Sequence, residues 1–174
     1  MINNKIHFDF RKENAVQALM WLLSRHGYKL DKMKALKLMY LADKTHLAKY
    51  GRPIAGGNYY AMRFGPVCSE LYDVFKDPSD TPFHIEDNDL SANECGFKED
   101  YLSESDKEVL FEIDEKFGLR DQFSLSSYTH DLPEYKNVWD ESRKDGREKI
   151  DYESILNDEE MKEIILDDQS AWDF

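Results

Sequence analysis

The chain has 174 residues, a net charge of −13, a hydrophobic fraction of 41% and a charged fraction of 34%. This length is enough for one domain with its own core, and no apolar run approaches the roughly 20 residues that cross a bilayer. Because the first residues lack an export signal and Cys68 and Cys95 form no CxxC pair, we expect a cytoplasmic protein with two free thiols.

The charge is divided unevenly along the chain. Residues 1–76 carry 13 Lys/Arg against 6 Asp/Glu, residues 77–150 carry 9 against 21, and residues 151–174 carry 1 against 9. A basic first lobe followed by an acidic remainder is atypical of a general nucleic-acid binder, and an acidic surface favours a basic partner. An acidic surface that serves only solubility explains the same charge equally well.

Two long helices are predicted in the first third of the chain. The first follows the N-cap candidate Asp9 and covers about residues 11–26, where apolar residues recur at helical spacing. The second follows Asp31, covers about residues 32–50 and ends at Gly51, because a glycine favours the left-handed position after a helix.

A strand and a third helix are expected after a break at Gly56-Gly57. Residues 58–62 are short, aromatic and typical of a strand. Gly65-Pro66 then favours a helix over residues 66–75, because proline loses nothing by its missing N–H in a first turn. Residues 77–102 are polar and rich in turns, and their scattered apolar residues predict a small antiparallel hairpin.

Shorter helices are predicted further along. The capping-box pattern Ser105-x-x-Glu108 opens a fourth helix that runs to Phe117. Residues 121–130 predict a fifth helix, and residues 134–139 predict one more helical turn.

The end of the chain is acidic. Residues 140–149 are predicted to be a linker or a solvated surface, and an amphipathic segment follows. The apolar positions of this segment are Ile155, Leu156, Met161, Ile164 and Ile165. We therefore expect a mainly α, compact helical domain with a small antiparallel β element at residues 1–140. Residues 141–174 would form a C-terminal extension that packs on the same domain or binds a partner.

Asp43 is the unusual residue of the second helix, because it falls near the middle of an apolar face. Burying an unpaired carboxylate costs several kcal/mol, so Asp43 requires hydrogen-bond donors. One interpretation is structural, with Asp43 holding the glycine turns and the strand against the helix. The other is a pocket in which Asp43 orients His46 or His130 as a general base. The candidate donors are His130, Thr129, Tyr60, Arg63 and backbone N–H groups of the turns at Gly56-Gly57 and at residues 65–67.

The sequence offers little else for catalysis. No HExxH motif, no paired CxxC motif and no carboxylate cluster is present, so we expect neither a metal site nor a cofactor. A convincing nucleophile is also missing, which disfavours an enzyme. Lys34, Lys37 and Lys44 fall opposite the apolar stripe of the second helix. Such a row is typical of the solvated face of an amphipathic helix, and contact with DNA phosphates is the alternative.

An ordered set of short segments carries a family resemblance. These segments are KALKLMYLAD at residues 34–43, GRPIAGGNYYA at 51–61, RFGPV at 63–67, and Leu125-x-x-x-Thr129-His130 followed by Trp139. Together they resemble the signature of the Panacea-domain family, the SocA-like or GepA-like antitoxins. The matching signature positions are Lys37, Tyr40, Asp43, Gly51, Pro53, Tyr60, Ala61, Gly65, Pro66, Val67, Thr129 and His130.

This resemblance implies a largely helical, non-enzymatic domain of phage-associated and toxin–antitoxin operons. Family members neutralise diverse toxins, usually by direct binding and in some cases as adaptors that present a toxin to a protease. On the resemblance, the chain is an antitoxin, and most signature positions keep the fold rather than contact the partner.

The partner surface is then expected outside the signature. The acidic C-terminal segment suits a basic toxin, with Trp172, Phe174, Ile164 and Ile165 as contact candidates. Packing of this segment on its own domain is an equal alternative. A second hypothesis is a phage or mobile-element regulator that contacts operator DNA or a host protease through the basic lobe. A third is a hydrolase or ligand-binding protein that uses Asp43 and His130.

Overall fold

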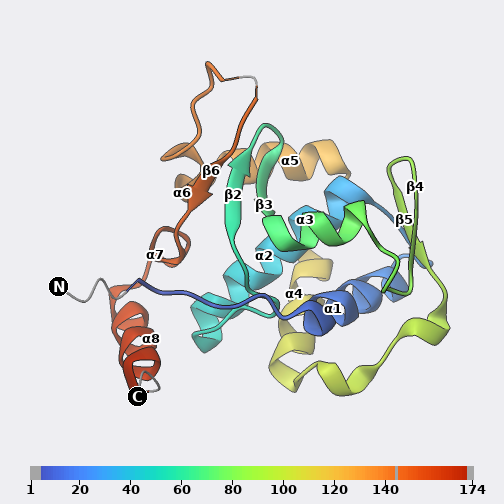
Figure 1. Ribbon diagram of the computed structural model, residues 1–174, viewed down its shortest axis with the longest axis horizontal. Coiled ribbons are helices and arrows are strands. Elements are labelled where there is room, and N and C mark those ends of the chain that lie inside the picture. The colour runs from blue at the N-terminus through green and yellow to red at the C-terminus, as the bar shows by residue number, and fades with distance from the viewer. Residues whose placement is uncertain (1–4, 144, 172–174) are drawn as a thin grey trace.

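The computed structural model describes residues 5–143 and 145–171. Eight α-helices and two three-stranded antiparallel sheets make up the described part, which confirms the predicted mainly α fold (Figure 1). The helices are α1 Lys12–Arg25, α2 Lys32–Tyr50, α3 Ser69–Lys76, α4 Glu104–Phe117, α5 Gln122–His130, α6 Pro133–Lys136, α7 Tyr152–Ile155 and α8 Glu159–Ala171. The strands are β1 Lys29–Asp31, β2 Tyr59–Met62, β3 Gly65–Cys68, β4 Phe83–Glu86, β5 Asp89–Ala92 and β6 Glu148–Ile150. Two 3₁₀ turns, η1 Glu94–Gly96 and η2 Glu99–Tyr101, lead into α4.

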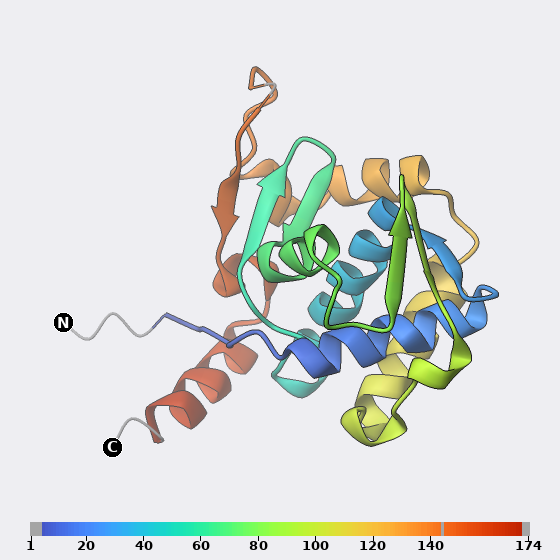
Figure 2. The same cartoon turned by 45° about the vertical axis from the view of Figure 1, so that its right-hand side comes forward.

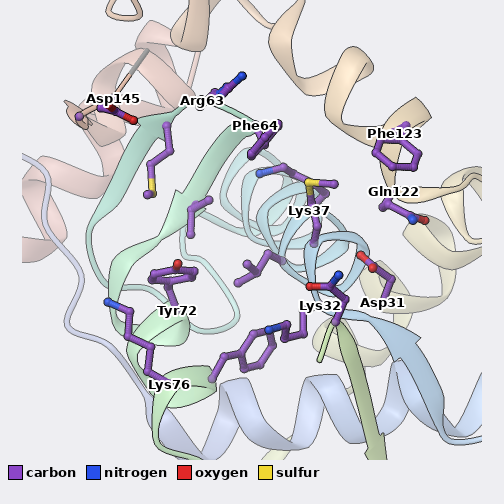
Figure 3. Close-up of a pocket in the computed structure, with 17 residues that line it drawn as sticks. Asp31, Lys32, Lys37, Arg63, Phe64, Tyr72, Lys76, Gln122, Phe123 and Asp145 are labelled. Carbon is purple, nitrogen blue, oxygen red and sulfur yellow. The ribbon is translucent and has the colours of Figure 1, made fainter. Parts of the chain in front are cut away.

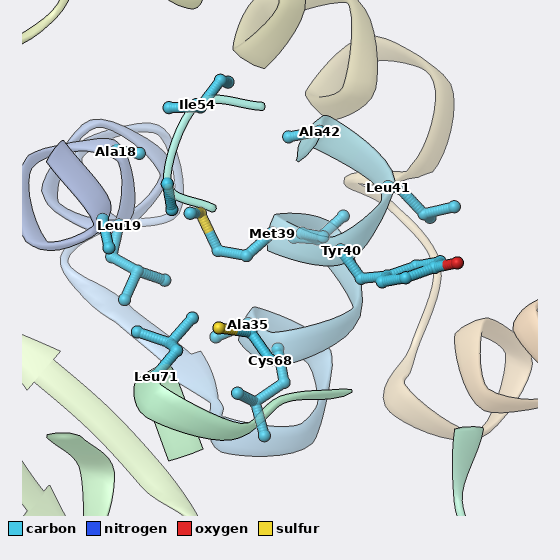
Figure 4. Packing of buried hydrophobic residues seen from close by; sticks show 14 of the residues in the cluster. Ala18, Leu19, Ala35, Met39, Tyr40, Leu41, Ala42, Ile54, Cys68 and Leu71 are labelled. Atoms are coloured by element: carbon cyan, nitrogen blue, oxygen red, sulfur yellow. The ribbon is translucent and has the colours of Figure 1, made fainter. Parts of the chain in front are cut away.

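Helix α2 is the centre of the molecule. It begins where the Asp31 carboxylate accepts a hydrogen bond from the backbone N–H of Lys34, and it ends at Gly51 with φ +74°. Helices α1, α4 and α5 and strand β3 all pack against it. Figure 4 shows the resulting core, in which Ala18 and Leu19 of α1 lie next to Met39 of α2.

The two sheets lie on different sides of this helical core (Figure 1). One has the strand order β3-β2-β6, with Ala61 opposite Pro66 and Tyr60 opposite Lys149. The other has the order β1-β5-β4 and contains the hairpin predicted within residues 77–102. Strand β1 was not expected, because it has three residues and only six residues separate α1 from α2.

The prediction of a helix start at Gly65-Pro66 is wrong. Residues 65–68 form strand β3, and α3 begins at Ser69. Proline is tolerated here because β3 is an edge strand. The carbonyl of Pro66 accepts a hydrogen bond from Lys37 and therefore points away from β2. The missing N–H of Pro66 thus removes no hydrogen bond between the two strands.

Two further predictions of local structure need correction. The capping box of α4 consists of Ser103 and Asp106, two residues before the predicted one, because the hydroxyl of Ser105 contacts His46 instead. Residues 140–149 are not a linker throughout, since residues 148–150 pair with β2 as strand β6. The pairing of β6 depends on a distant segment, whereas Ser103-x-x-Asp106 and Ser105-x-x-Glu108 are two overlapping local cap patterns.

The C-terminal part of the described chain packs onto the rest. Tyr152, Ile155 and Leu156 are buried in the common core, and the Tyr152 hydroxyl donates to the carbonyl of Gly57 at 2.7 Å. Helix α8 lies beside the N-terminal segment (Figure 2), where the Gln169 amide exchanges hydrogen bonds with the backbone of His7. The division of the chain at residue 140 remains a prediction.

Candidate functional site

The prediction of a solvated lysine row on α2 is wrong for Lys34, Lys37 and Lys44. Lys37 is 1% exposed, and its Nζ donates to the carbonyl oxygen of Pro66 at 2.9 Å. The Nζ atoms of the other two lysines donate to Gly118 and Glu134. Because neighbouring elements pack around this part of α2, these three side chains end at acceptors within the molecule.

Asp43 is fully engaged by donors from the segment that precedes β2. Its Oδ1 accepts from the backbone N–H groups of Ile54 and Ala55, both at 2.9 Å, and its Oδ2 accepts from the Tyr59 hydroxyl at 2.5 Å. These donors differ from all the candidates predicted from the sequence. Burial raises the pKa of Asp43 to about 6, although the three hydrogen bonds act in the opposite direction. The geometry ties residues 54–59 to α2.

The histidines predicted to cooperate with Asp43 are placed elsewhere. The ring of His46 contacts the carbonyl of Arg52 at 2.6 Å and the hydroxyl of Ser105 at 2.9 Å. The ring of His130 stacks on Tyr135, with 4.7 Å between centroids. Burial, followed by the charge of Lys37, lowers the pKa of His130. Neither histidine donates to Asp43 among the described residues, so the predicted base–carboxylate pair is not assembled there.

The turn between β2 and β3 is anchored by side-chain hydrogen bonds from three helices. It carries Arg63 and Phe64 at its exposed tip, and its carbonyl groups at alternate positions accept hydrogen bonds from three different helices. These bonds run from Tyr135 Oη of α6 to Met62 at 2.7 Å, from Ser126 Oγ of α5 to Phe64 at 2.8 Å, and from Lys37 Nζ of α2 to Pro66 at 2.9 Å. The turn is therefore fixed in place although its two central side chains face solvent.

Gly65 and Thr129 explain how the turn comes so close to α5. Gly65 has φ +111°, and a Cβ at this position would lie 2.7 Å from Thr129 Oγ1. The Thr129 hydroxyl in turn bonds to backbone carbonyls of its own helix, both at 3.0 Å. A side chain at residue 65 is therefore excluded both by backbone conformation and by space.

The remaining signature positions lie within the framework. The hydroxyl of Tyr40 donates to the buried carboxylate of Glu134 at 2.8 Å. Tyr60 is half-buried on β2, where the guanidinium of Arg147 lies 4.6 Å from its ring centroid. The other positions are Gly51 at the end of α2, the buried Pro53 in the following loop, and the buried Ala61 and Val67 of the sheet.

A groove of about 700 Å³ opens in front of this turn (Figure 3). Its walls come from the start of α2, the β2–β3 turn, α3 and the start of α5. Three aromatic side chains on these walls are exposed: Phe123 at 69%, Phe64 at 56% and Tyr72 at 38%. Exposed aromatic side chains around a concave surface are typical of a binding site.

The groove is basic although the chain is acidic. Its lining includes the cationic side chains of Lys32, Arg63 and Lys76, against the carboxylates of Asp31 and Asp145. Lys37 forms part of the lining as well, but burial lowers its pKa to about 7. This surface was not predicted from the sequence, because the predicted helix over residues 66–75 left Arg63-Phe64 outside any hairpin.

The predicted partner contacts in the C-terminal segment are only partly accessible. Ile165 is 3% exposed and packs near Gly51, so it is not available as a contact, whereas Ile164 is 50% exposed. Trp172 and Phe174 lie outside the described residues.

Among the residues that the structure describes, no group of three or more His, Cys, Asp or Glu side chains is arranged to hold a metal ion. None of the helices in residues 5–143 and 145–171 has the length and apolar character to span a membrane.

Comparison with known proteins identifies the family to which the chain belongs. A family model described as antitoxin SocA-like, Panacea domain, matches residues 36–139, which is more than half of the chain. No curated protein and no solved structure matches it. The matched segment contains the β2–β3 turn and the three side chains that hold it. The chain belongs to the family of SocA-like antitoxins with a Panacea domain.

Proposed function

We propose that this member of the Panacea-domain family is an antitoxin that neutralises a cognate toxin by direct protein–protein binding in the cytoplasm. The family match supports the antitoxin role. The observation that carries direct binding is the fixed β2–β3 turn, which holds Arg63 and Phe64 at the edge of an aromatic groove within the matched segment.

The groove is the proposed toxin contact. A side chain that is already fixed before binding loses little conformational entropy on association, and aromatic anchors dominate the energy of many interfaces. Phe64, Tyr72 and Phe123 are exposed aromatic residues. The backbone of each is held by a helix or by the anchored turn. The signature residues then act indirectly, by building the turn and not by touching the toxin.

Neutralisation on this proposal needs no catalysis. Both carboxylate oxygens of Asp43 are occupied by structural hydrogen bonds, and His130 packs against Tyr135. The alternative of DNA binding through the basic lobe also loses support, because Lys34, Lys37 and Lys44 bond to acceptors within the chain. A role as a protease adaptor would use the same toxin contact.

The C-terminal segment is a second proposed contact. Ile164 is exposed on the acidic helix α8, and Trp172 and Phe174 follow it in the sequence. Truncation after residue 171 tests the two aromatic residues in the assay described next.

Co-expression with the toxin tests the proposal. The neighbouring open reading frame is expressed alone, to establish growth arrest, and then with the wild-type chain or with the Phe64→Ala/Phe123→Ala variant. We expect the wild type to relieve the arrest and the variant to fail, since losing two anchors weakens binding by about 2–4 kcal/mol. The matched control is Phe111→Ala/Leu119→Ala, which removes two exposed apolar side chains outside the groove. A wild-type chain that does not relieve the arrest, or a groove variant that still does, would contradict this assignment.

A further inference from the structure

We infer that the groove receives a segment of the partner protein in which apolar residues are flanked by Asp or Glu side chains. This inference rests on the proposed use of the groove as the toxin contact. It reverses the expectation from net charge, by which an acidic antitoxin would select a basic toxin surface.

The lining of the groove carries cations with few partners within the described residues. Lys32 and Arg63 have no ion-pair partner within the described parts of the chain, and Lys76 has only the exposed carboxylate of Asp73 at 3.6 Å. One of the two lining acids, Asp31, is already committed to capping α2. With Lys32, Arg63 and Lys76 against two carboxylates, the lining keeps a net positive charge.

Two of the three lining cations lie against an aromatic ring. The guanidinium of Arg63 lies 5.3 Å from the ring centroid of Phe64, and the ammonium of Lys76 lies 4.6 Å from that of Tyr72. Figure 3 shows the two pairs on different walls of the groove, one on the β2–β3 turn and the other on α3. A carboxylate beside an apolar side chain matches such a pair, because it meets the cation while its neighbour covers the ring.

The net charge of −13 does not prevent this recognition. At physiological ionic strength charges are screened over about 8 Å, so the side chains of the groove outweigh distant acidic residues at contact. The same net charge disfavours a nucleic acid, which also combines flat rings with anions but would bring many more phosphates past the acidic surface.

Fluorescence anisotropy with the full chain tests the inference. The probes are a fluorescein-labelled peptide with a leucine–phenylalanine core flanked by glutamates, and the same peptide with lysines in place of the glutamates. We expect only the acidic peptide to bind, with an affinity that falls as salt is raised. In the Lys32→Glu/Arg63→Glu variant its affinity should fall at least about tenfold. The matched control is Lys98→Glu/Lys116→Glu, which makes the same change in net charge at two exposed lysines outside the groove and should bind as the wild type does.

Several results would overturn the inference. They are equal or tighter binding of the lysine peptide, absence of binding by either peptide, displacement of the acidic peptide by oligothymidylate, and a dimer in light scattering that the groove variant dissociates. The last result would assign the groove to a second copy of the chain.

The co-expression assay separates this inference from the proposed function. Relief of growth arrest that survives Lys32→Glu/Arg63→Glu but not Phe64→Ala/Phe123→Ala would retain the toxin contact and reject the acidic partner segment. Binding of the acidic peptide by a chain that never relieves the arrest would retain the preference for an acidic segment and reject the toxin contact.

Discussion

Lys37 is a residue whose environment in the structure differs from the one that its sequence position indicates. Its position in the KALKLMYLAD segment indicated a signature residue, and its place on a helical wheel indicated solvent. The structure instead buries its amine under the β2–β3 turn, where it donates to Pro66. A buried amine with a backbone carbonyl as its acceptor is costly to keep charged, so the charged form of Lys37 lowers the stability of the fold.

Replacing Lys37 by methionine should expose this cost. Burial lowers the pKa of Lys37 from 10.5 to about 7, so the unfolded chain binds more protons than the folded chain between these values. The contribution of Lys37 to the free energy of unfolding therefore rises as pH increases from 7 to 10.5, by up to about 4 kcal/mol. We expect Lys37→Met to be more stable than the wild type at pH 7, and this advantage to shrink toward pH 10.

Urea unfolding at pH 7, 8.5 and 10 measures this difference. The lost hydrogen bond to Pro66 leaves a buried acceptor and costs about 1–3 kcal/mol, which should be visible at pH 10 as a variant less stable than the wild type. A difference between variant and wild type that is constant with pH would contradict the assignment of a buried, easily deprotonated amine.

The β2–β3 turn is the element on which the site depends. Three helices hold its carbonyl groups, and Gly65 lets it approach α5. None of these partners is close in sequence, the nearest being Lys37, 29 residues before Pro66. Sequence patterns therefore identified the turn residues as important without predicting the turn.

Gly65→Ala and Gly146→Ala form a matched pair for this element. Both glycines have similar φ values, +111° and +113°, so both alanines carry backbone strain of about 1–3 kcal/mol. Only at Gly65 would the new Cβ clash, since at Gly146 the nearest atom is 3.9 Å away. We expect Gly65→Ala to lower the free energy of unfolding by at least about 2 kcal/mol more than Gly146→Ala, as measured by thermal or urea unfolding. Equal losses would mean that the packing against Thr129 is not tight.

At the scale of the whole molecule, folding brings the basic first lobe against the acidic remainder. Side chains of α1 and α2 and the following loop form ion pairs with α4. These pairs are Arg25 with Asp114 and Glu115, Lys49 with Glu108 and Glu112, and Arg52 with Asp106. Basic residues of the first lobe thus pair with acidic residues of the same chain. The uneven charge along the sequence does not by itself define a binding surface.

Asp106 gives a test of this arrangement. Burial alone would raise the pKa of its carboxyl, but the His46 ring at 3.2 Å, the hydrogen bond from the backbone N–H of Ser103 and the charge of Arg52 lower it to about 2. The stabilisation is therefore present above the ordinary value of 3.8 and is lost as pH falls through 2. We expect Asp106→Asn to cost about 1–2 kcal/mol at pH 6 and much less at pH 2.

The same substitution at an exposed acid supplies the control. Asp131→Asn removes a carboxylate whose one ion-pair partner among the described residues is the exposed Lys136, and it should change stability by under about 1 kcal/mol. Urea unfolding at pH 6 and pH 2 measures both variants. A loss of stability in Asp106→Asn that is as large at pH 2 as at pH 6 would show that ionisation of this carboxyl does not cause the loss.

The sequence by itself determined the helical class, the limits of α2, the hairpin within residues 77–102 and the family, because caps, glycine stops and apolar periodicity are local. It also required that a buried Asp43 have donors. Only the tertiary structure decided that those donors come from residues 54, 55 and 59, that Lys37 is buried, and that Arg63 and Phe64 form the rim of a groove. Each of these facts depends on contacts between segments distant in sequence, and such contacts leave no periodic pattern in either partner.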